Sequence, residues 1–210
     1  MTEYAVHAFA TLFVVIDPLG NLPIFVALTR GEDAAHKRRM ALRGVAIATG
    51  VLLLFALTGA RVLEVLGIGL PAFRTAGGLM LLLIALEMVF ERRNERRSRT
   101  ADRIASETGP RDVSVFPIAI PLVSGPGAIT SLLLLQGRTE GDLGLQAILL
   151  AALLVALGVS LLLFLLADPI ERVLGDTLIS VISRLLGILL AALASQFLLD
   201  GLREGLRGPG

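Results

Sequence analysis

Two short stretches combine prolines, glycines and polar side chains inside long hydrophobic segments. The first reads PLGNLP at residues 18–23, and the second reads PLVSGP at residues 121–126. In each stretch two prolines stand five residues apart, with Asn21 or Ser124 between them. Proline lacks a backbone N–H donor, and both proline and glycine are unfavourable in a helix interior. The pattern therefore predicts a break in each of two membrane-length helices.

The predicted breaks would expose main-chain groups that can bind a charged ligand. A residue before proline avoids the α-helical conformation, so the first half-helices should end near residues 16–17 and 120. Asn21 and Ser124 are good N-cap residues, and the second half-helices should begin directly after them. Residues 18–21 (break 1) and 121–124 (break 2) would then be unwound near the bilayer middle. Unwound backbone persists there only inside protein or beside an aqueous cavity.

The ends of the four half-helices suit a zwitterion. Free N–H groups at a helix start favour a carboxylate, and free carbonyls at a helix end favour an ammonium group or a cation. Glycines let a small ligand approach the backbone closely, and Thr130 could add a hydroxyl group one turn beyond Gly127. The predicted substrate-binding residues are Asp17, Gly20, Asn21, Pro23, Ser124, Gly125, Gly127 and Thr130, and the predicted helix-breaking residues are Pro18, Pro23, Pro121 and Pro126. One proline kink alone would more often be structural, but two in register favour function.

Asp17 is the acidic residue that lies deepest in a hydrophobic segment. A carboxylate at membrane depth costs about 2.5–3.5 kcal/mol on insertion scales and suggests a functional site; the structural alternative is an N-cap before Pro18. Counting along the helices puts Asp17 and Arg184 at similar depths. We therefore expect an Asp17–Arg184 ion pair with a part in cation coupling. Arg74 should instead extend to the membrane surface, and Glu87 should face lipid headgroups, with a site role as the alternative.

The elements that carry these residues have membrane length. The 210 residues are 55% hydrophobic and 18% charged, whereas soluble domains carry about 25% charged residues. Apolar segments of roughly 17–25 residues span a bilayer. Six are predicted, at 4–29, 41–60, 71–90, 113–136, 144–167 and 178–200. The expected fold is all-α and polytopic.

The two halves of the chain resemble one another. A charged linker, 91–112, separates a first repeat, 1–90, from a second repeat with a short flexible tail, 113–210. Further matches are VLEVLG with IERVLG, at residues 62 and 170, and Arg74-x-x-Gly with Arg184-x-x-Gly. Three crossings per half would invert one half relative to the other, as in many secondary transporters. If the broken segments are instead re-entrant hairpins, each half crosses twice and the repeats are parallel; we prefer crossing segments.

The charge distribution predicts an orientation. Loops 30–43, 91–112 and 167–184 share one side and hold most of the 19 Lys and Arg residues. Basic loops stay in the cytoplasm, so the linker should be cytoplasmic and both termini external. Gly77 and Gly187 should allow close helix packing.

The residue inventory excludes several classes of function. The chain has no cysteine and two histidines, so disulfides, thiolate sites and histidine-based metal sites are not expected. No nucleophile–base pair lies within the segments, and we expect no enzyme, no metal and no cofactor beyond a coupling proton or sodium ion. The expected partners are a small zwitterionic substrate and the lipid bilayer, without nucleic acid; a homo-oligomer is compatible with the sequence.

Segments 1 and 4, FVVIDPLGNLPIF and FPIAIPLVSGPGAIT, resemble the MarC family of bacterial inner-membrane proteins. RTAGGLMLLLIALEM and SRLLGILLAALASQFLLDG resemble it too, so that the likeness covers residues 5–201. The motif positions are Asp17, Pro18, Gly20, Asn21, Pro23, Pro121, Ser124, Gly125, Pro126 and Gly127. The resemblance implies a six-helix inner-membrane protein, historically labelled for multiple antibiotic resistance, with members described as transporters of glycine or alanine.

The leading functional expectation is therefore a secondary transporter of a small neutral amino acid that works by alternating access. The alternatives are export of another small amphipathic metabolite, a channel, and a non-transporting membrane scaffold or regulator.

Overall fold

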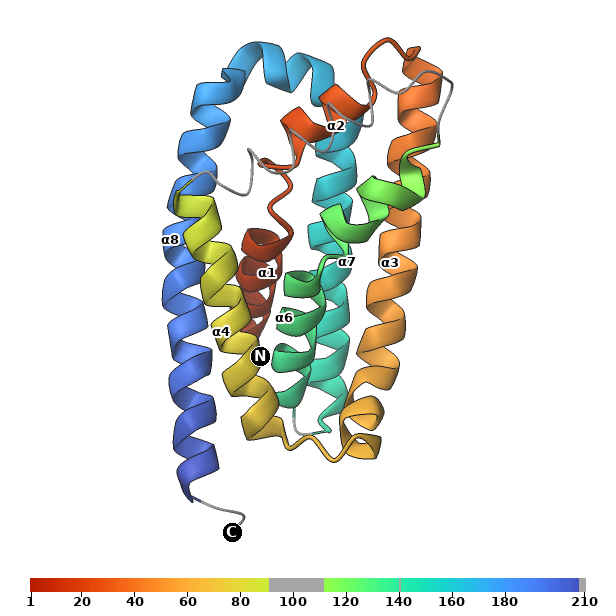
Figure 1. Ribbon diagram of the computed structural model, residues 1–210. Coiled ribbons are helices and arrows are strands. Elements are labelled where there is room, and N and C mark those ends of the chain that lie inside the picture. Colours follow the sequence, from red (N-terminus) through yellow and green to blue (C-terminus); the bar gives the residue numbers. More distant parts are fainter. Residues whose placement is uncertain (91–111, 140, 208–210) are drawn as a thin grey trace.

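The computed structural model describes residues 1–90, 112–139 and 141–207, which form a bundle of helices (Figure 1). The elements are α1 Thr2–Ile16, α2 Leu22–Leu28, α3 Ala34–Val65, α4 Leu70–Val89, η1 Ser114–Val123, α6 Pro126–Gly137, α7 Leu143–Leu165 and α8 Ala167–Arg207. Within these residues there is no β-strand, which confirms the all-α class. The predicted charged linker, apart from Asp112, lies outside the described residues.

The predicted membrane spans are reproduced in part. Among the described residues, four helices are long and apolar enough to cross a bilayer: α3, α4, α7 and residues Thr177–Leu206 of α8. A fifth span results if η1 and α6, which meet at 49°, form one broken crossing. Helix α1 has 15 residues and is therefore about 22 Å long, which is shorter than the ~30 Å hydrocarbon core.

Helix α8 differs from the prediction at both of its ends. A loop was expected over residues 167–184, but the chain is helical from Ala167, with a bend at Gly175. Gly175 has φ 66°, a conformation that glycine adopts without the steric cost of a side chain, and the chain turns over the top of the bundle there (Figure 1). The predicted flexible tail after residue 200 is also wrong as far as Arg207, because this part of α8 still packs on α4.

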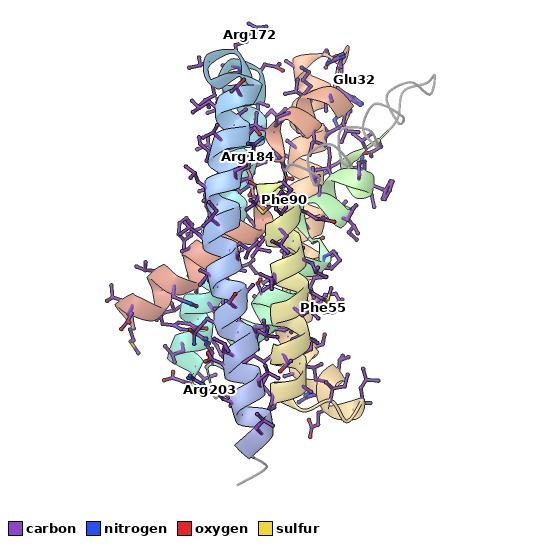
Figure 2. The ribbon with its side chains drawn as sticks, turned by 60° about the vertical axis from the view of Figure 1, so that its left-hand side comes forward. Glu32, Phe55, Phe90, Arg172, Arg184 and Arg203 are labelled. Carbon is purple, nitrogen blue, oxygen red and sulfur yellow. The ribbon has the colours of Figure 1, made fainter. Side chains whose placement is uncertain are left out.

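Helices α4 and α8 pack closely along their length (Figures 1 and 2). A Cβ atom added at Gly78 would lie 2.6 Å from the Leu198 backbone nitrogen, and one at Gly187 would lie 2.9 Å from Met88 Cβ. Both glycines therefore allow the two backbones to approach. This confirms the packing role predicted for Gly187, and Gly77 plays the same role against α6.

Corresponding helices of the two halves make corresponding contacts. Helix α1 packs on α7 and η1 packs on α3, while α6 packs on α4 and α2 packs on α8. The chain runs in opposite directions in α3 and α7, and again in α4 and α8 (Figure 1).

Candidate functional site

Break 1 is a tight turn organised by Asp17. Its backbone N–H donates to the Phe13 carbonyl at 3.0 Å, and its left-handed conformation, φ 53°, ends α1. Its fully buried side chain accepts hydrogen bonds at Oδ1 from the Gly20 N–H, at 3.1 Å, and from the Ser183 hydroxyl, at 3.3 Å. Asp17 thus shapes the turn and connects it to α8.

Gly20 makes room for the Asp17 carboxylate. A Cβ atom at Gly20 would lie 2.2 Å from Asp17 Oδ2, so any side chain would displace the carboxylate. The open backbone that we expected to admit a ligand is therefore covered by the chain itself.

An equivalent hydrogen bond from a side chain to a main-chain carbonyl is present at each break. The Asn21 amide donates to the Ile16 carbonyl at 2.8 Å, and the Ser124 hydroxyl donates to the Ala119 carbonyl at 2.8 Å. Each bond reaches back five residues, and the alignment that matches Pro18 with Pro121 matches these two bonds as well. Asn21 is the N-cap residue of α2, as predicted, whereas Gly125 takes that position in α6 instead of Ser124. Neither the Asn21 nor the Ser124 side chain makes a capping hydrogen bond, because each donates to a carbonyl of the preceding half-helix.

The structure brings the two breaks together. The Asn21 Nδ2 atom lies 3.5 Å from the carbonyl oxygen of Leu122, in the middle of break 2. Both residues are buried. The two breaks therefore form one region inside the protein, as expected for segments that line a common site.

Break 2 is more irregular than predicted. A regular half-helix was expected to end near residue 120, but η1 is a wide, distorted helix with extended conformations at Phe116 and Ile120. Each of these residues precedes a proline, and a proline disfavours the helical conformation of its predecessor. Pro117, which the sequence prediction did not use, accounts for the earlier distortion, and α6 then begins at Pro126 with Gly125 as its N-cap.

A cavity of 470 Å³ lies beside break 2. Its walls come from η1 with break 2, from the start of α6 and from one face of α4, with smaller parts from α1 and α2. The lining residues are Val15, Ile24, Met80, Leu83, Ile84, Glu87, Phe116, Pro117, Pro121, Leu122, Val123, Gly125, Pro126, Gly127 and Ala128. The cavity is thus mainly apolar, with the Glu87 carboxylate on one wall and the first turn of α6 on another.

The cavity divides the predicted site residues. Gly125 and Gly127 line it, together with the helix-breaking Pro121 and Pro126; the other predicted residues, Asp17, Pro18, Gly20, Asn21, Pro23, Ser124 and Thr130, do not. The methyl group of Thr130 instead lies against Gly77 of α4. Break 1 thus does not line the cavity itself, but it packs against break 2, which does.

Glu87 is a functional candidate for which a site role was only the alternative prediction. It was expected near the headgroups, but it lines the cavity with Met80, Leu83 and Ile84. These four residues follow the i, i+3, i+4, i+7 spacing of one helix face. That spacing was a signal in the sequence, and it becomes informative once another element is known to pack on the same face.

Arg74 and Arg184 have different surroundings in the structure. Arg74, predicted to extend to the membrane surface, is buried and forms an ion pair with Glu204 at the end of α8. Arg184 has an exposed side chain, and its neighbour Ser183 makes the contact with Asp17. The Asp17–Arg184 ion pair stays a prediction.

Further ion pairs connect the helices at both ends of the bundle. Lys37 of α3 lies 2.8 Å from Asp168 of α8. At the opposite end, Arg138 lies 3.1 Å from Asp200 of α8. Within the described residues, no group of three or more His, Asp or Glu side chains could hold a metal ion.

Comparison with known proteins confirms the resemblance seen in the sequence. A family model described as MarC family integral membrane protein matches residues 2–206. A UPF0056 membrane protein of Methanocaldococcus jannaschii is 33% identical over 97% of this chain and 98% of its own length. The UPF0056 inner membrane protein YhgN of Escherichia coli is 32% identical over 97% and 98%, and the UPF0056 membrane protein YvbG of Bacillus subtilis is 30% identical over 97% and 96%. No solved structure matches the chain.

Proposed function

Because this chain belongs to the MarC family of integral membrane proteins, we propose that it is a multi-pass secondary transporter of a small neutral amino acid, of the glycine or alanine class. The observation that carries the proposal is the 470 Å³ cavity beside break 2. Small-molecule sites usually occupy roughly 300–1,000 Å³ and combine apolar walls with a few polar groups. The proposed activity is transport, not catalysis.

The chemistry of the cavity walls supports a zwitterionic substrate. The substrate carboxylate binds at the start of α6, where the N–H groups of Gly127 and Ala128 precede the first intrahelical hydrogen bonds and the helix dipole is positive. The ammonium group faces Glu87 on the opposite wall. Apolar side chains such as Ile84 fill the space between and favour a short side chain on the substrate.

Alternating access rests on two inverted three-helix repeats, 1–90 and 113–210. In this arrangement α1 and α2 form one broken crossing, η1 and α6 form the other, and both termini are external. The matched hydrogen bonds of Asn21 and Ser124 and the exchange of helix contacts between the two halves support the repeat. Transporters of this plan bind substrate where the broken helices meet.

Asp17 is the proposed coupling residue for a proton or a sodium ion. It is a fully buried carboxylate at a helix break, and it contacts Ser183 of the other repeat. Binding of a cation at Asp17 would therefore act on the position of α8 relative to break 1. Asp17 lies behind the cavity wall, so the cation and the substrate occupy neighbouring positions.

Counterflow in proteoliposomes tests the proposal. Vesicles loaded with unlabelled alanine should accumulate labelled alanine, and Glu87→Gln should reduce this uptake strongly because the ammonium group loses its counter-charge. Glu64→Gln is the matched control, because Glu64 lines a different cavity between α3, α4 and α6. Absence of uptake of alanine, glycine and serine by folded protein would remove this substrate class.

The open, apolar side of the cavity favours a second candidate, export of another small amphipathic metabolite. Leu83 and Phe116 line the cavity and are 56% and 61% exposed, so the cavity faces the region where lipid would lie. Stronger competition by leucine than by glycine in the same counterflow assay would favour this candidate.

A further inference from the structure

Two hydroxyl groups are fully buried between the half-helices α1 and α6. Thr11 and Ser131 have 0% exposure, and neither hydroxyl has a hydrogen-bond partner within the part of the chain that the structure describes. Several other hydroxyls in the helices donate to the carbonyl four residues earlier at 2.7–2.9 Å, among them Thr49, Ser160 and Ser195. This local bond is the usual way to satisfy a helical Ser or Thr. Thr11 and Ser131 therefore differ from these helical hydroxyls.

Contacts on either side of Thr11 and Ser131 indicate that these two residues belong to one interface between α1 and α6. The Tyr4 hydroxyl donates to the Leu135 carbonyl at 2.9 Å, and Val15 Cγ1 lies 3.2 Å from the position of a Cβ atom at Gly127. Because residue 4 meets residue 135 and residue 15 meets residue 127, the two helices are antiparallel. Thr11 is one turn before Val15, and Ser131 is one turn after Gly127. Helical geometry therefore directs the two hydroxyls toward each other.

Burial of unpartnered hydroxyls costs stability, and such groups call for an explanation. Val15 and Gly127 line the cavity, and from them the two hydroxyls lie one turn further toward the end of the bundle at which α8 ends (Figure 1). If α1 and α6 separate, water or a polar substrate can satisfy both groups. A purely structural interface would be more stable with Val or Ala at these positions, because no buried hydroxyl would lack a hydrogen bond.

We propose that the α1–α6 interface is a closed aqueous route from the cavity to the membrane face that carries the C-terminus, with Thr11 and Ser131 as its polar lining. This inference rests on the proposed function, since alternating access requires a route to each face. At the end of the same interface, Arg138 is paired with Asp200 at 3.1 Å and lies 4.9 Å from the ring centre of Phe197. These contacts close the mouth of the route in the present conformation.

Single cysteines test the route, because the chain has no cysteine of its own. Thr11→Cys and Ser131→Cys are compared with Leu12→Cys and Leu132→Cys, whose native residues are adjacent on the same helices and also 0% exposed. Each variant is reconstituted in vesicles and treated with a small, positively charged methanethiosulfonate reagent. If an open state is populated at the level of a few per cent, positions 11 and 131 should react about tenfold faster than positions 12 and 132.

Equal reaction rates at all four positions would overturn the route. Thr11→Val and Ser131→Ala provide a second test that does not depend on cysteine: both should raise the unfolding temperature and lower uptake, and raised stability with unchanged uptake would also count against the proposal. The labelling needs no knowledge of the substrate. Fast labelling without alanine uptake would therefore remove the proposed substrate and leave the route standing.

Discussion

The side-chain amide of Asn21 lies 3.5 Å from the main-chain carbonyl of Leu122, and this contact joins two helix breaks that are far apart in the sequence. The same amide donates to the Ile16 carbonyl at 2.8 Å. Asn21 thus donates a hydrogen bond to the last carbonyl of α1 and also approaches the unwound backbone of break 2. Its position explains why break 1 supports the site although it does not line the cavity.

We expect Asn21→Ala to destabilise the protein by about 1–3 kcal/mol, because the buried Ile16 carbonyl loses its donor. Ser124→Ala should have a similar effect through the Ala119 carbonyl. The Asn21 variant should be the less stable of the two, because it also loses the contact with the Leu122 carbonyl. Thermal unfolding in detergent micelles measures both. Thr58→Ala is the control, since its hydroxyl bond is solvent-exposed; equal stability of all three variants would contradict this account of the breaks.

Gly20→Ala should displace the Asp17 carboxylate, because the added Cβ atom would lie 2.2 Å from Oδ2. Overpacking of this kind typically lowers the free energy of unfolding by about 1–3 kcal/mol. The matched control is Gly50→Ala in α3, where nothing lies within 4 Å, and where alanine should be neutral or stabilising by up to about 1 kcal/mol. Chemical denaturation of both variants compares them, and a Gly20→Ala protein as stable as Gly50→Ala would show that the carboxylate can move freely.

The Arg74–Glu204 ion pair should contribute to the packing of α8 on α4. The Arg74 side chain is 8% exposed and that of Glu204 is 46% exposed, so Glu204→Gln leaves a buried charge without its partner. We expect a loss of about 1–2 kcal/mol, which is below the cost of breaking a fully buried pair. The double variant Arg74→Gln, Glu204→Gln should recover part of this loss. Arg203→Gln, at an exposed position, is the control (Figure 2); additive losses in the double variant would exclude the pairing.

The pKa of the Asp112 carboxyl should lie below the ordinary pKa of an aspartate. Hydrogen bonds from the Ser114 hydroxyl and N–H hold the pKa of the Asp112 carboxyl below its ordinary value, with a smaller effect of Arg43. A lowered folded-state pKa stabilises the fold above the ordinary pKa, and this contribution disappears as the pH falls through the folded-state pKa. The connection of η1 to α3 should therefore hold at neutral pH and weaken only below about pH 4.

Nuclear magnetic resonance titration of the Asp112 carboxyl carbon measures this pKa directly. Ser114→Ala should raise the pKa more than Arg43→Gln does, because the Ser114 hydrogen bonds have the larger effect. A larger shift in the Arg43 variant would reverse the assigned order of causes.

The sequence by itself determined the all-α class, the family and the positions at which two helices break. These features depend on local chemistry: apolar segments of membrane length, prolines that exclude the helical conformation, and a carboxylate that is costly in lipid. The roles of Asn21 and Ser124 could not be predicted in the same way. Both are favourable N-caps by residue type, but the choice between the preceding carbonyl and the following N–H depends on the path of the backbone.

Only the tertiary structure decided which residues face the cavity and which support it. Glu87 lines the cavity because α4 presents that face to break 2. Thr130 does not line it, because its side chain packs against Gly77 of α4. Likewise, Arg74 is buried because Glu204 of a helix distant in the sequence packs beside it. Residue type limits what a side chain can do, whereas the facing surface of a partner helix, set by long-range packing, decides which neighbour it meets.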